Sequence, residues 1–198
     1  MARNTQPVLK RCRTLGVSPA VMGYSRTSNK NPGGQRRTKK SEYATQLTEK
    51  QKVKFVYGIQ EKQFHAYYEK ASKMAGNTGE ELLCMIERRL DNVVYRLGFA
   101  STRREARQLV NHGHFTVNGK RVNIPSYLVK TGDVVAVCEK SCSNAFFKKL
   151  KEDDVFAATP KWLDRDKNTL TGKVIAAPAR DDIDFEIAEH LIVELYSK

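Results

Sequence analysis

Long apolar runs are missing from this chain of 198 residues. No stretch approaches the ~20 consecutive apolar residues that a membrane-spanning helix needs, so the sequence predicts no membrane segment. The N-terminus carries charge but no apolar core region, which argues against a secretory signal. Because 40% of the residues are nevertheless hydrophobic, the chain can bury a modest core and is not composed like a disordered protein.

Cysteine is also scarce, at four residues. Cys84 lies in an apolar helical run and is expected to be a core residue. Cys138 and Cys142 form a lone pair with no matching second pair, which is weak support for a metal or redox site. The simplest location for such a chain is the reducing cytoplasm.

Recognisable catalytic motifs are absent as well. The sequence has no phosphate-binding glycine loop, and its four histidines have no Ser, Cys or carboxylate partner in a recognised arrangement. His112 and His114 flank Gly113 at the end of a basic segment, where contact with phosphate or simple exposure is favoured over a metal site. The acidic stretch DDIDFE is interpreted as an exposed loop or a docking patch. We therefore predict no enzyme, no metal site and no cofactor.

Positive charge, by contrast, is abundant and unevenly distributed. The formal net charge is +13. Counting Lys and Arg against Asp and Glu gives +11 for residues 1–54, zero for 55–98, +4 for 99–140 and −2 for 141–198. A solvated surface explains scattered lysines but does not explain this concentration. A nucleic acid partner is therefore favoured.

Residues 1–45 are expected to form an irregular arm. The segment TSNKNPGGQRRTKK combines Pro32, Gly33 and Gly34 with the densest basic run of the chain. Such a segment cannot bury enough apolar surface to order itself, so we expect it to take shape on its partner.

Helical periodicity begins at Thr48. An aromatic stripe follows that could stack on bases, although its helical spacing favours a core face: Phe64, Tyr67, Tyr68, Ala71 and Met74. Thr78 with Glu81 then predicts a capping box at the start of a further helix. An apolar seam at alternating spacings of three and four is expected to continue from there to Gly98: Leu83, Ile86, Leu90, Val93 and Leu97.

The stretch STRREARQLVNHGHFTVNG, residues 101–119, predicts a short basic helix and a tight hairpin. Thr102 with Glu105 repeats the capping-box pattern, Gly113 ends the helix, and Asn118-Gly119 is a hairpin turn. Three arginines at helical spacing are expected to cluster opposite the apolar face: Arg103, Arg104 and Arg107. Because guanidinium groups bind phosphate bidentately, this helix predicts a rigid RNA-binding ridge, with a solvated helix face as the alternative.

The rest of the chain predicts short elements. VVAV, at residues 134–137, is expected to be a strand, and NAFFKKLKEDDVF a helix. TPKWLDRDKNTLTGKVIAAP is expected to hold two strands around a turn at Asn168. The apolar run in the terminal EHLIVELYSK is too short to be anything but a buried element.

These motifs resemble the bacterial small-subunit ribosomal protein S-four family. The resemblance is carried by GNTGEELL, by RLDNVVYRLGFASTRREARQLVNHGHFTVNGKRVNIPSYLVKTGDVV and by the terminal EHLIVELYSK. It runs from about Thr48 to Lys198 and more loosely through the arm. The basic helix with its hairpin looks like the small RNA-binding module named after that family, which some RNA-modifying enzymes and tyrosyl-tRNA synthetases also carry. The flanking motifs make the resemblance specific.

The resemblance implies an α+β fold. A helical subdomain would carry an inserted small RNA-binding module, in which helices pack on a short antiparallel sheet, behind the irregular basic arm. The implied domains are the arm at 1–45, the helical subdomain at 46–87 completed by 180–198, and the module at 88–179. The core of that module would be residues 88–150, with the C-terminal strands after it.

The implied function is structural. The chain would bind the five-way junction in the 5′ domain of 16S rRNA, nucleate assembly of the subunit body, contact ribosomal protein S-five, line the channel through which mRNA arrives and support translational accuracy. Some relatives also repress translation of their own operon. The residues expected to contact rRNA are Arg103, Arg104, Arg107, Lys120 and Arg121 of the module and, on charge alone, Arg3, Lys10, Arg11 and Arg13 of the arm. Arg36, Arg37 and Lys39 are expected beside the mRNA, with a tail that binds rRNA generally as the alternative.

Metal binding is where this chain departs from part of the family. Zinc-bearing members hold the metal with four cysteines in the arm, whereas this arm has only Cys12. A closed tetrahedral site needs four ligands, so the sequence resembles the zinc-free variant.

Two rival functions remain open at this point. An RNA-modifying enzyme could carry the same module, but it needs a separate catalytic domain, for which the chain leaves little room. A free regulator that binds only its own mRNA is the second. Sedimentation with the small subunit distinguishes a ribosomal protein from both.

Overall fold

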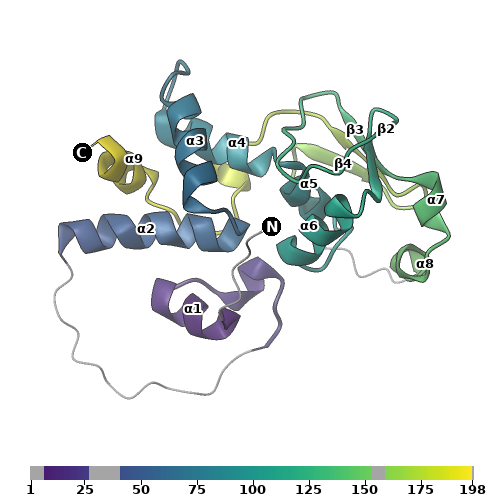
Figure 1. Cartoon of the computed structure of the whole chain (residues 1–198), viewed down its shortest axis with the longest axis horizontal. Coiled ribbons are helices and arrows are strands. Elements are labelled where there is room, and N and C mark those ends of the chain that lie inside the picture. Colours follow the sequence, from purple (N-terminus) through teal and green to yellow (C-terminus); the bar gives the residue numbers. More distant parts are fainter. Residues whose placement is uncertain (1–6, 27–40, 153–158, 198) are drawn as a thin grey trace. The chain divides into compact units, whose positions relative to one another are not determined.

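A computed structural model describes residues 7–26, 41–152 and 159–197 of the chain (Figure 1). Its internal contacts divide the chain into two units. We call Met1–Leu82 with Ile183–Lys198 the helical unit, and Leu83–Asp182 the sheet unit. Helices together with a five-stranded antiparallel sheet confirm the predicted α+β class. Among the described helices, none is both long and apolar enough to cross a membrane.

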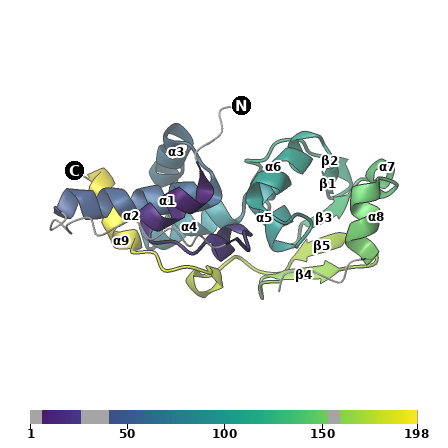
Figure 2. The same ribbon diagram turned by 90° about the horizontal axis from the view of Figure 1, so that it is seen from below.

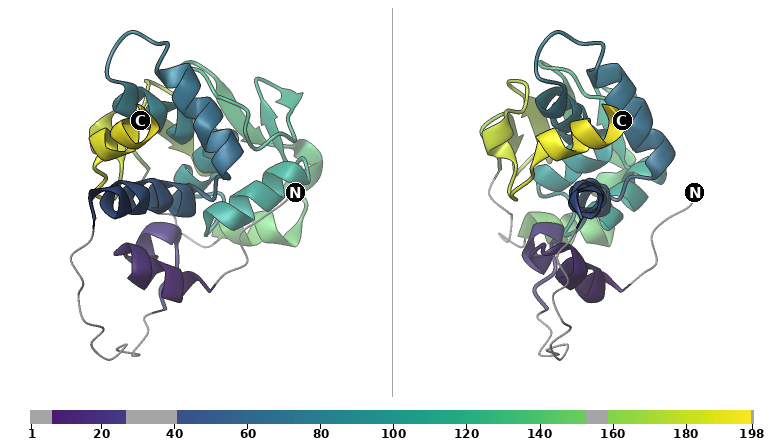
Figure 3. Two further views of the ribbon diagram at one scale, coloured as in Figure 1. Left: turned by 60° about the vertical axis from the view of Figure 1, so that its left-hand side comes forward. Right: turned by 90° about the vertical axis from the view of Figure 1, so that its left-hand side faces the viewer.

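The helical unit joins segments from the two ends of the chain. Its elements are α1 (Val8–Leu15), the 3-10 helix η1 (Pro19–Met22), α2 (Glu42–Tyr57), α3 (Glu61–Ala71) and α9 (Glu189–Ser197). Helix α9 packs beside α2, as Figures 1 and 3 show. Polar contacts support this packing, since Lys52 Nζ donates to the carbonyl of Glu186 at 3.4 Å and the amide of Ala188 donates to Glu49 Oε2 at 3.3 Å.

The aromatic stripe of α3 belongs to the core of this unit. Phe64 is fully buried, and Tyr67 and Ala71 are buried with it. This confirms the core interpretation for these three residues. Met74 lies beyond the end of α3 and is 45% exposed, so the buried stripe ends before it.

The described part of the arm is more regular than the sequence predicted. Helix α1 buries Cys12 and Leu15, and η1 buries Met22. The prediction of an irregular arm is therefore wrong for residues 7–26, because a few apolar side chains on one face suffice to order a short helix against α2. Helix α2 also begins earlier than Thr48, since the Ser41 hydroxyl accepts a hydrogen bond from the amide of Ala44 and caps it.

The sheet unit follows after α4 (Thr78–Glu87), whose last turns belong to it. Its helical elements are α5 (Leu90–Arg96), α6 (Arg103–Asn111), α7 (Glu139–Cys142), α8 (Ala145–Glu152) and the 3-10 helix η2 (Arg180–Asp182). Its strands are β1 (Phe115–Val117), β2 (Lys120–Arg121), β3 (Val134–Val137), β4 (Leu163–Asp166) and β5 (Thr171–Val174). They form one antiparallel sheet in the order β2-β1-β3-β5-β4 (Figure 2). The predicted strands around VVAV and Asn168 are thus confirmed. The helix predicted in NAFFKKLKEDDVF is confirmed over Ala145–Glu152, and the end of that stretch, 153–156, lies outside the described residues.

Helices α5 and α6 share one hydrophobic core with the sheet and α8. The ring of Phe115 stacks near that of Phe99 and meets Phe147 of α8 edge-on, with centroids 6.1 Å apart in both pairs. A Cβ atom at Gly172 of β5 would overlap the side chain of Leu97, just beyond α5. Strand β5 therefore approaches this segment as closely as a glycine allows, and the position of α5 on the sheet is fixed.

Candidate nucleic-acid interface

Helix α6 has both ends fixed by its own sequence. At its start, Thr102 Oγ1 accepts a hydrogen bond from the amide of Glu105 at 3.2 Å, which confirms the predicted cap. The Glu105 carboxylate reaches back to the amide of Ser101 at 2.7 Å, one residue earlier than in a standard capping box. At its end, Gly113 has a φ of +72°, a conformation that favours glycine, and the last helical carbonyls accept from the amides that follow.

The arginines of α6 do not all face the solvent. Arg103 is buried, with 6% exposure. Its Nε donates to Asn92 Oδ1 at 2.8 Å, and its guanidinium stacks on the ring of Tyr95 at 4.3 Å from the centroid. The prediction that all three arginines lie opposite the core is therefore wrong for Arg103. Helical spacing places it four residues from Arg107 but also three and seven residues from the buried Ala106 and Val110, and on that side α5 supplies its partners.

Arg107 is partly buried, at 21% side-chain exposure, and it binds Asp91. Its Nε lies 2.8 Å and its Nη2 2.7 Å from Asp91 Oδ2. The same carboxylate holds Arg89, whose Nε donates to Oδ1 at 3.0 Å and whose Nη2 donates to Oδ2 at 2.9 Å. Arg104, between the two paired arginines of α6, is exposed. Of the three predicted arginines, only Arg104 has the full exposure that the sequence analysis assumed.

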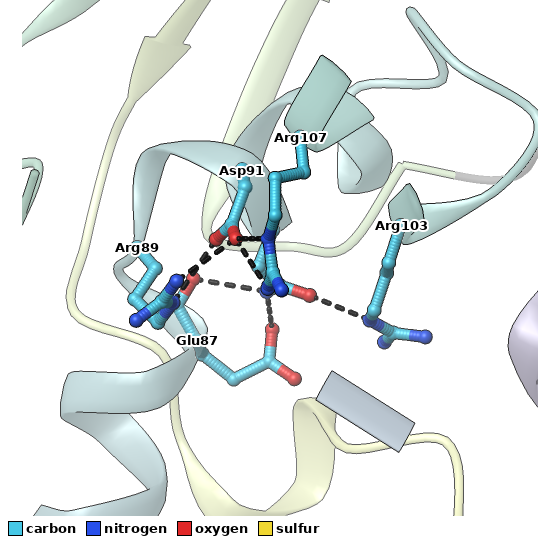
Figure 4. A network of polar contacts seen from close by, with 6 residues as sticks. Glu87, Arg89, Asp91, Arg103 and Arg107 are labelled. Atoms are coloured by element: carbon cyan, nitrogen blue, oxygen red, sulfur yellow. Dashed lines mark hydrogen bonds and ion pairs between the residues drawn. The ribbon is translucent and has the colours of Figure 1, made fainter. Parts of the chain in front are cut away.

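A second buried carboxylate lies beside the first (Figure 4). Glu87, whose side chain is 1% exposed, receives hydrogen bonds from Arg96 Nε at 3.1 Å and Nη2 at 2.8 Å. Asn92 Nδ2 donates to the same group at 2.6 Å, and through Asn92 Oδ1 the chain of contacts reaches Arg103. We call Glu87, Arg89, Asp91, Asn92, Arg96, Arg103 and Arg107 the carboxylate–arginine network. Charged groups so deeply buried are stable only when they are paired and hydrogen-bonded, as these are.

The network lies where the helix predicted through the apolar seam is interrupted, and the sequence analysis missed this interruption. The apolar seam was expected to form one helix up to Gly98, but α4 ends at Glu87 and α5 begins at Leu90. Arg89 is extended between them, with a ψ of 137°. The amides of Leu90 and Asp91 donate to the carbonyls of Tyr127 and Pro125, so a loop of the module replaces the helical partners.

The cap of α4 is also displaced from its predicted position. Asn77 Oδ1 accepts from the amide of Gly79 at 3.0 Å, and the Asn77 amide group donates to Glu80 at 3.0 Å. Thr78 is the first helical residue, so the predicted pairing of Thr78 with Glu81 is wrong by one residue. Asn is as good a cap as Thr, and the local sequence alone did not decide between them.

The hairpin is attached to the end of α6 by an arginine. Asn118 and Gly119 both have positive φ, which confirms the tight turn between β1 and β2. Lys120 is exposed. Arg121 Nε donates to the carbonyl of Gly113 at 2.8 Å and its Nη2 to that of His112 at 3.1 Å. The remainder of the Arg121 side chain is exposed at the surface, so this residue both orients the hairpin and adds positive charge beside the helix.

The two histidines lie next to this attachment. Burial, followed by the nearby charges of His112 and Arg121, lowers the pKa of His114 below its ordinary value. His114 Nδ1 is 2.9 Å from Ser141 Oγ, and its ring packs on Phe147. His114 is thus a packed, neutral side chain at neutral pH, while His112 is exposed.

The arm contributes a second set of cations, in the helical unit. Lys10 and Arg13 are exposed on α1, and Arg11 is half-buried beside them. Four other predicted contact residues lie outside the described residues: Arg3, Arg36, Arg37 and Lys39. Cys12 is 1% exposed, its Sγ is 4.0 Å from Met22 Sδ, and burial raises the pKa of its thiol. Within the described ranges, no three His, Cys, Asp or Glu side chains are placed to hold a metal ion.

Glu87, Asp91 and Asn92 are the members of the network that the sequence analysis missed. They stand in the seam predicted to be apolar, next to Arg88, Arg89 and Arg96. Carboxylates inside an apolar seam, close to several arginines, are the signal that could have revealed a buried network.

Comparison with known proteins gives consistent matches along the chain. A family profile described as "Ribosomal protein S4/S9 N-terminal domain" matches residues 3–87, and one described as "S4 domain" matches residues 88–135. The chain is 52% identical over 198 residues to "Small ribosomal subunit protein uS4" of Fusobacterium nucleatum. It is 62% and 63% identical over 208 residues to proteins of that name from Caldicellulosiruptor bescii and Caldicellulosiruptor saccharolyticus. Each match covers 100% of both chains.

Proposed function

The chain belongs to the small ribosomal subunit protein uS4 family, and from this membership we propose how its basic surfaces bind small-subunit rRNA. As a family member it is a structural constituent of the small ribosomal subunit, active on ribosomes in the bacterial cytoplasm, and not an enzyme. The rivals considered for the sequence, an RNA-modifying enzyme and a free regulator, lose their basis.

The observation that carries the proposal is the arrangement around α6. Exposed Arg104 and partly exposed Arg107 lie on the helix, and Arg121 connects the exposed strand β2 to the end of that helix. Because this connection fixes the hairpin relative to the helix, the cations of both elements reach the RNA with little loss of freedom. Phosphates and 2′-hydroxyls in the shallow groove of A-form RNA are the groups that such a surface fits.

The predicted contact residues of the module are proposed to have three different roles. Arg104, Arg107 and Lys120 contact phosphates, and Arg121 contacts RNA with the part of its side chain that the helix carbonyls leave exposed. Arg103 supports the surface from beneath, because it is 6% exposed and stacked on Tyr95. Its role in rRNA binding is therefore indirect.

The arm adds phosphate contacts of its own. Lys10 and Arg13 are exposed on α1, so their charges point away from the buried Cys12 and Leu15. Arg11 is half-buried on the side of Leu15, four residues later, and we assign it to rRNA on its charge. We also assign Arg3 to rRNA on its charge. The net charge of +11 in residues 1–54 supports this assignment. Each phosphate that these cations neutralise releases counterions, and this release strengthens binding.

Finer aspects of the function rest on the family resemblance. We propose that the target is the five-way junction in the 5′ domain of 16S rRNA and that binding there nucleates assembly of the subunit body. Ribosomal protein S-five is the proposed protein neighbour. Arg36, Arg37 and Lys39 are proposed to lie beside incoming mRNA and to contribute to accuracy. Repression of its own operon is proposed on the same ground.

Charge reversal tests the α6 surface. We expect Arg104→Glu combined with Lys120→Glu to weaken binding to a 5′-domain rRNA transcript by about tenfold or more, with a shallower salt dependence. Lys173→Glu, an exposed position on β5 outside residues 88–135, is the matched control and should change affinity less than about twofold. Equal losses in both variants contradict the assignment of the site. Filter binding across a salt series measures all three proteins.

A further inference from the structure

Asp91 lies where the network meets the surface. Its side chain is 4% exposed, and both of its oxygens are occupied by guanidinium groups. Arg89, on one side, is 3% exposed, while Arg107, on the other, reaches the surface with 21% of its side chain exposed. A buried anion thus holds one buried cation and one partly exposed cation. Figure 4 shows both arginines meeting the Asp91 carboxylate.

We propose that Asp91 is a positioning residue for rRNA binding, which fixes the guanidinium of Arg107 in the orientation that a phosphate group meets. The proposal rests on the function assigned above to Arg107. Two contacts to Asp91 Oδ2, from Nε at 2.8 Å and Nη2 at 2.7 Å, set the plane of the guanidinium group. Two donors on one carboxylate oxygen restrict the rotation of this planar group, so its outer edge is held in a narrow range of directions.

Arg89 explains why this carboxylate does not cancel the attraction for phosphate. It contacts Asp91 through Nε at 3.0 Å and Nη2 at 2.9 Å, so the two form a bidentate and electrically neutral pair. The positive charge of Arg107 is then additional to a neutral pair. One carboxylate alone beside Arg107 would repel an approaching phosphate, whereas the pair repels it much less.

The backbone at Asp91 is supported by the loop that follows β2. Its amide donates to the carbonyl of Pro125 at 3.2 Å, and the amide of Leu90 donates to that of Tyr127 at 2.8 Å. The carboxylate therefore stands on backbone that is attached to the loop after β2. Arg107 takes its orientation from α5 and this loop as well as from its own helix.

Arg107 loses less conformational entropy on binding RNA because Asp91 already orders its side chain in the free protein. This difference in entropy corresponds to about three- to tenfold in Kd for one rotamer-rich side chain. Asp91→Asn keeps the shape but removes the charge and places an amide against a guanidinium. We expect it to weaken rRNA binding by about this factor at unchanged salt slope, because the number of phosphates contacted stays the same.

A double-mutant cycle on the full-length protein tests the proposal. The measured quantity is Kd for a 5′-domain rRNA transcript, for Asp91→Asn, Arg107→Ala, Arg104→Ala and the two doubles that contain Asp91→Asn. With Arg107→Ala present, we expect Asp91→Asn to add less than about twofold. With Arg104→Ala present it should still cost its full factor, since Arg104 is exposed and serves as the matched control. Equal factors in both doubles mean that Asp91 acts on the fold in general and overturn the proposal.

Arg107→Lys provides a second test that does not depend on altering Asp91. Lysine keeps the charge, but its ammonium group is not planar. It therefore cannot approach Asp91 with two nitrogens in a fixed plane, as Arg107 does. We expect this variant to bind more weakly than the wild type, and wild-type affinity overturns the proposal. If Arg107→Ala alone has no effect while Arg104→Glu with Lys120→Glu does, the inference about Asp91 fails and the proposed α6 surface stands. If neither has an effect, the proposed surface itself fails.

Discussion

Each unit of the molecule holds its elements together with a charged cluster, and the two clusters are built differently. In the helical unit, Glu61 of α3 accepts from Lys50 at 2.9 Å, Lys54 at 2.6 Å and Tyr196 at 2.7 Å, and its side chain is 48% exposed. In the sheet unit, Glu87 and Asp91 are 1% and 4% exposed and bind arginines through two nitrogens each.

Exposure and chemistry together decide what each cluster does. Lysine presents a point charge without a preferred plane. Although Lys50 and Lys54 are 12% and 14% exposed, the carboxylate that they share is 48% exposed, so these pairs contribute little to stability and are partly screened by salt. Arginine presents a planar group that fixes direction, and a buried pair is costly to break. The cluster at Glu61 therefore strengthens helix packing to a small degree. The carboxylate–arginine network instead determines the geometry of the surface that we assign to RNA.

The largest expected effect is removal of one buried charge. Glu87→Gln leaves Arg96 without its anionic partner, so we expect a loss of about 3–5 kcal/mol in the free energy of unfolding of the sheet unit. Trp162, which is the single tryptophan and is 2% exposed, reports on this unit by fluorescence during urea unfolding. A loss below about 1 kcal/mol would remove the distinction between the two clusters.

A smaller effect is expected from exchanging one cation for another inside the network. Arg103→Lys keeps the charge but loses the stacked plane on Tyr95 and the directed bond to Asn92. We expect it to cost about 1–3 kcal/mol in the same fluorescence measurement. The matched control is Arg104→Lys, at an exposed position on the same helix, which should stay within about 0.5 kcal/mol of the wild type.

The smallest effect is expected at Glu61, and it depends on pH. Partial burial disfavours its ionised form, but hydrogen bonds from Lys54, Tyr196 and Lys50 outweigh this and lower the pKa of Glu61 from 4.5 to about 2. A carboxyl whose pKa is lowered in the folded state stabilises the protein at every pH above the pKa that the group has in the unfolded chain. This stabilisation is lost as the pH falls from 4.5 towards 2.

Glu61→Gln should therefore cost about 1 kcal/mol or less at neutral pH, and less still in high salt. Circular dichroism of the helices during urea unfolding measures it. The difference from the wild type should shrink as the pH is lowered below 4.5. If the difference in free energy of unfolding between Glu61→Gln and the wild type depends on neither pH nor salt, Glu61 acts by packing and not by its charge. The contrast that we draw between the two clusters would then fail.

Local patterns in the sequence predicted most of the elements correctly. The Asn118-Gly119 turn, the cap at Thr102 and the end of α6 at Gly113 depend on residues within a few positions of one another, and each is confirmed. The same holds for the strands on either side of Asn168. The domain boundaries, which come from the family resemblance, and the rRNA-contact residues, which were chosen for their charge and spacing, stay predictions.

Features that depend on distant partners could not be predicted in this way. The break between α4 and α5 exists because carbonyls of residues 125 and 127 replace helical partners, and the sequence near Arg89 does not contain that information. Arg103 lies three and seven residues before the buried Ala106 and Val110, so its spacing already puts it on the core side of α6. What the spacing does not contain is the partners that α5 supplies there, the Asn92 amide oxygen and the Tyr95 ring.

The contact between Gly113 and Arg121 has a consequence for how this module changes over generations. A Cβ atom at Gly113 would lie 2.5 Å from Nε of Arg121, in a backbone conformation that already disfavours a side chain. The guanidinium end of Arg121 can move aside, but it then gives up its hydrogen bonds to the carbonyls of Gly113 and His112. We therefore predict that the two positions are epistatic, with Gly113→Ala costing more while Arg121 is present than after Arg121 has become a shorter residue. Of the two mutational orders that lead to the same double variant, the one that alters Arg121 first is then the more accessible.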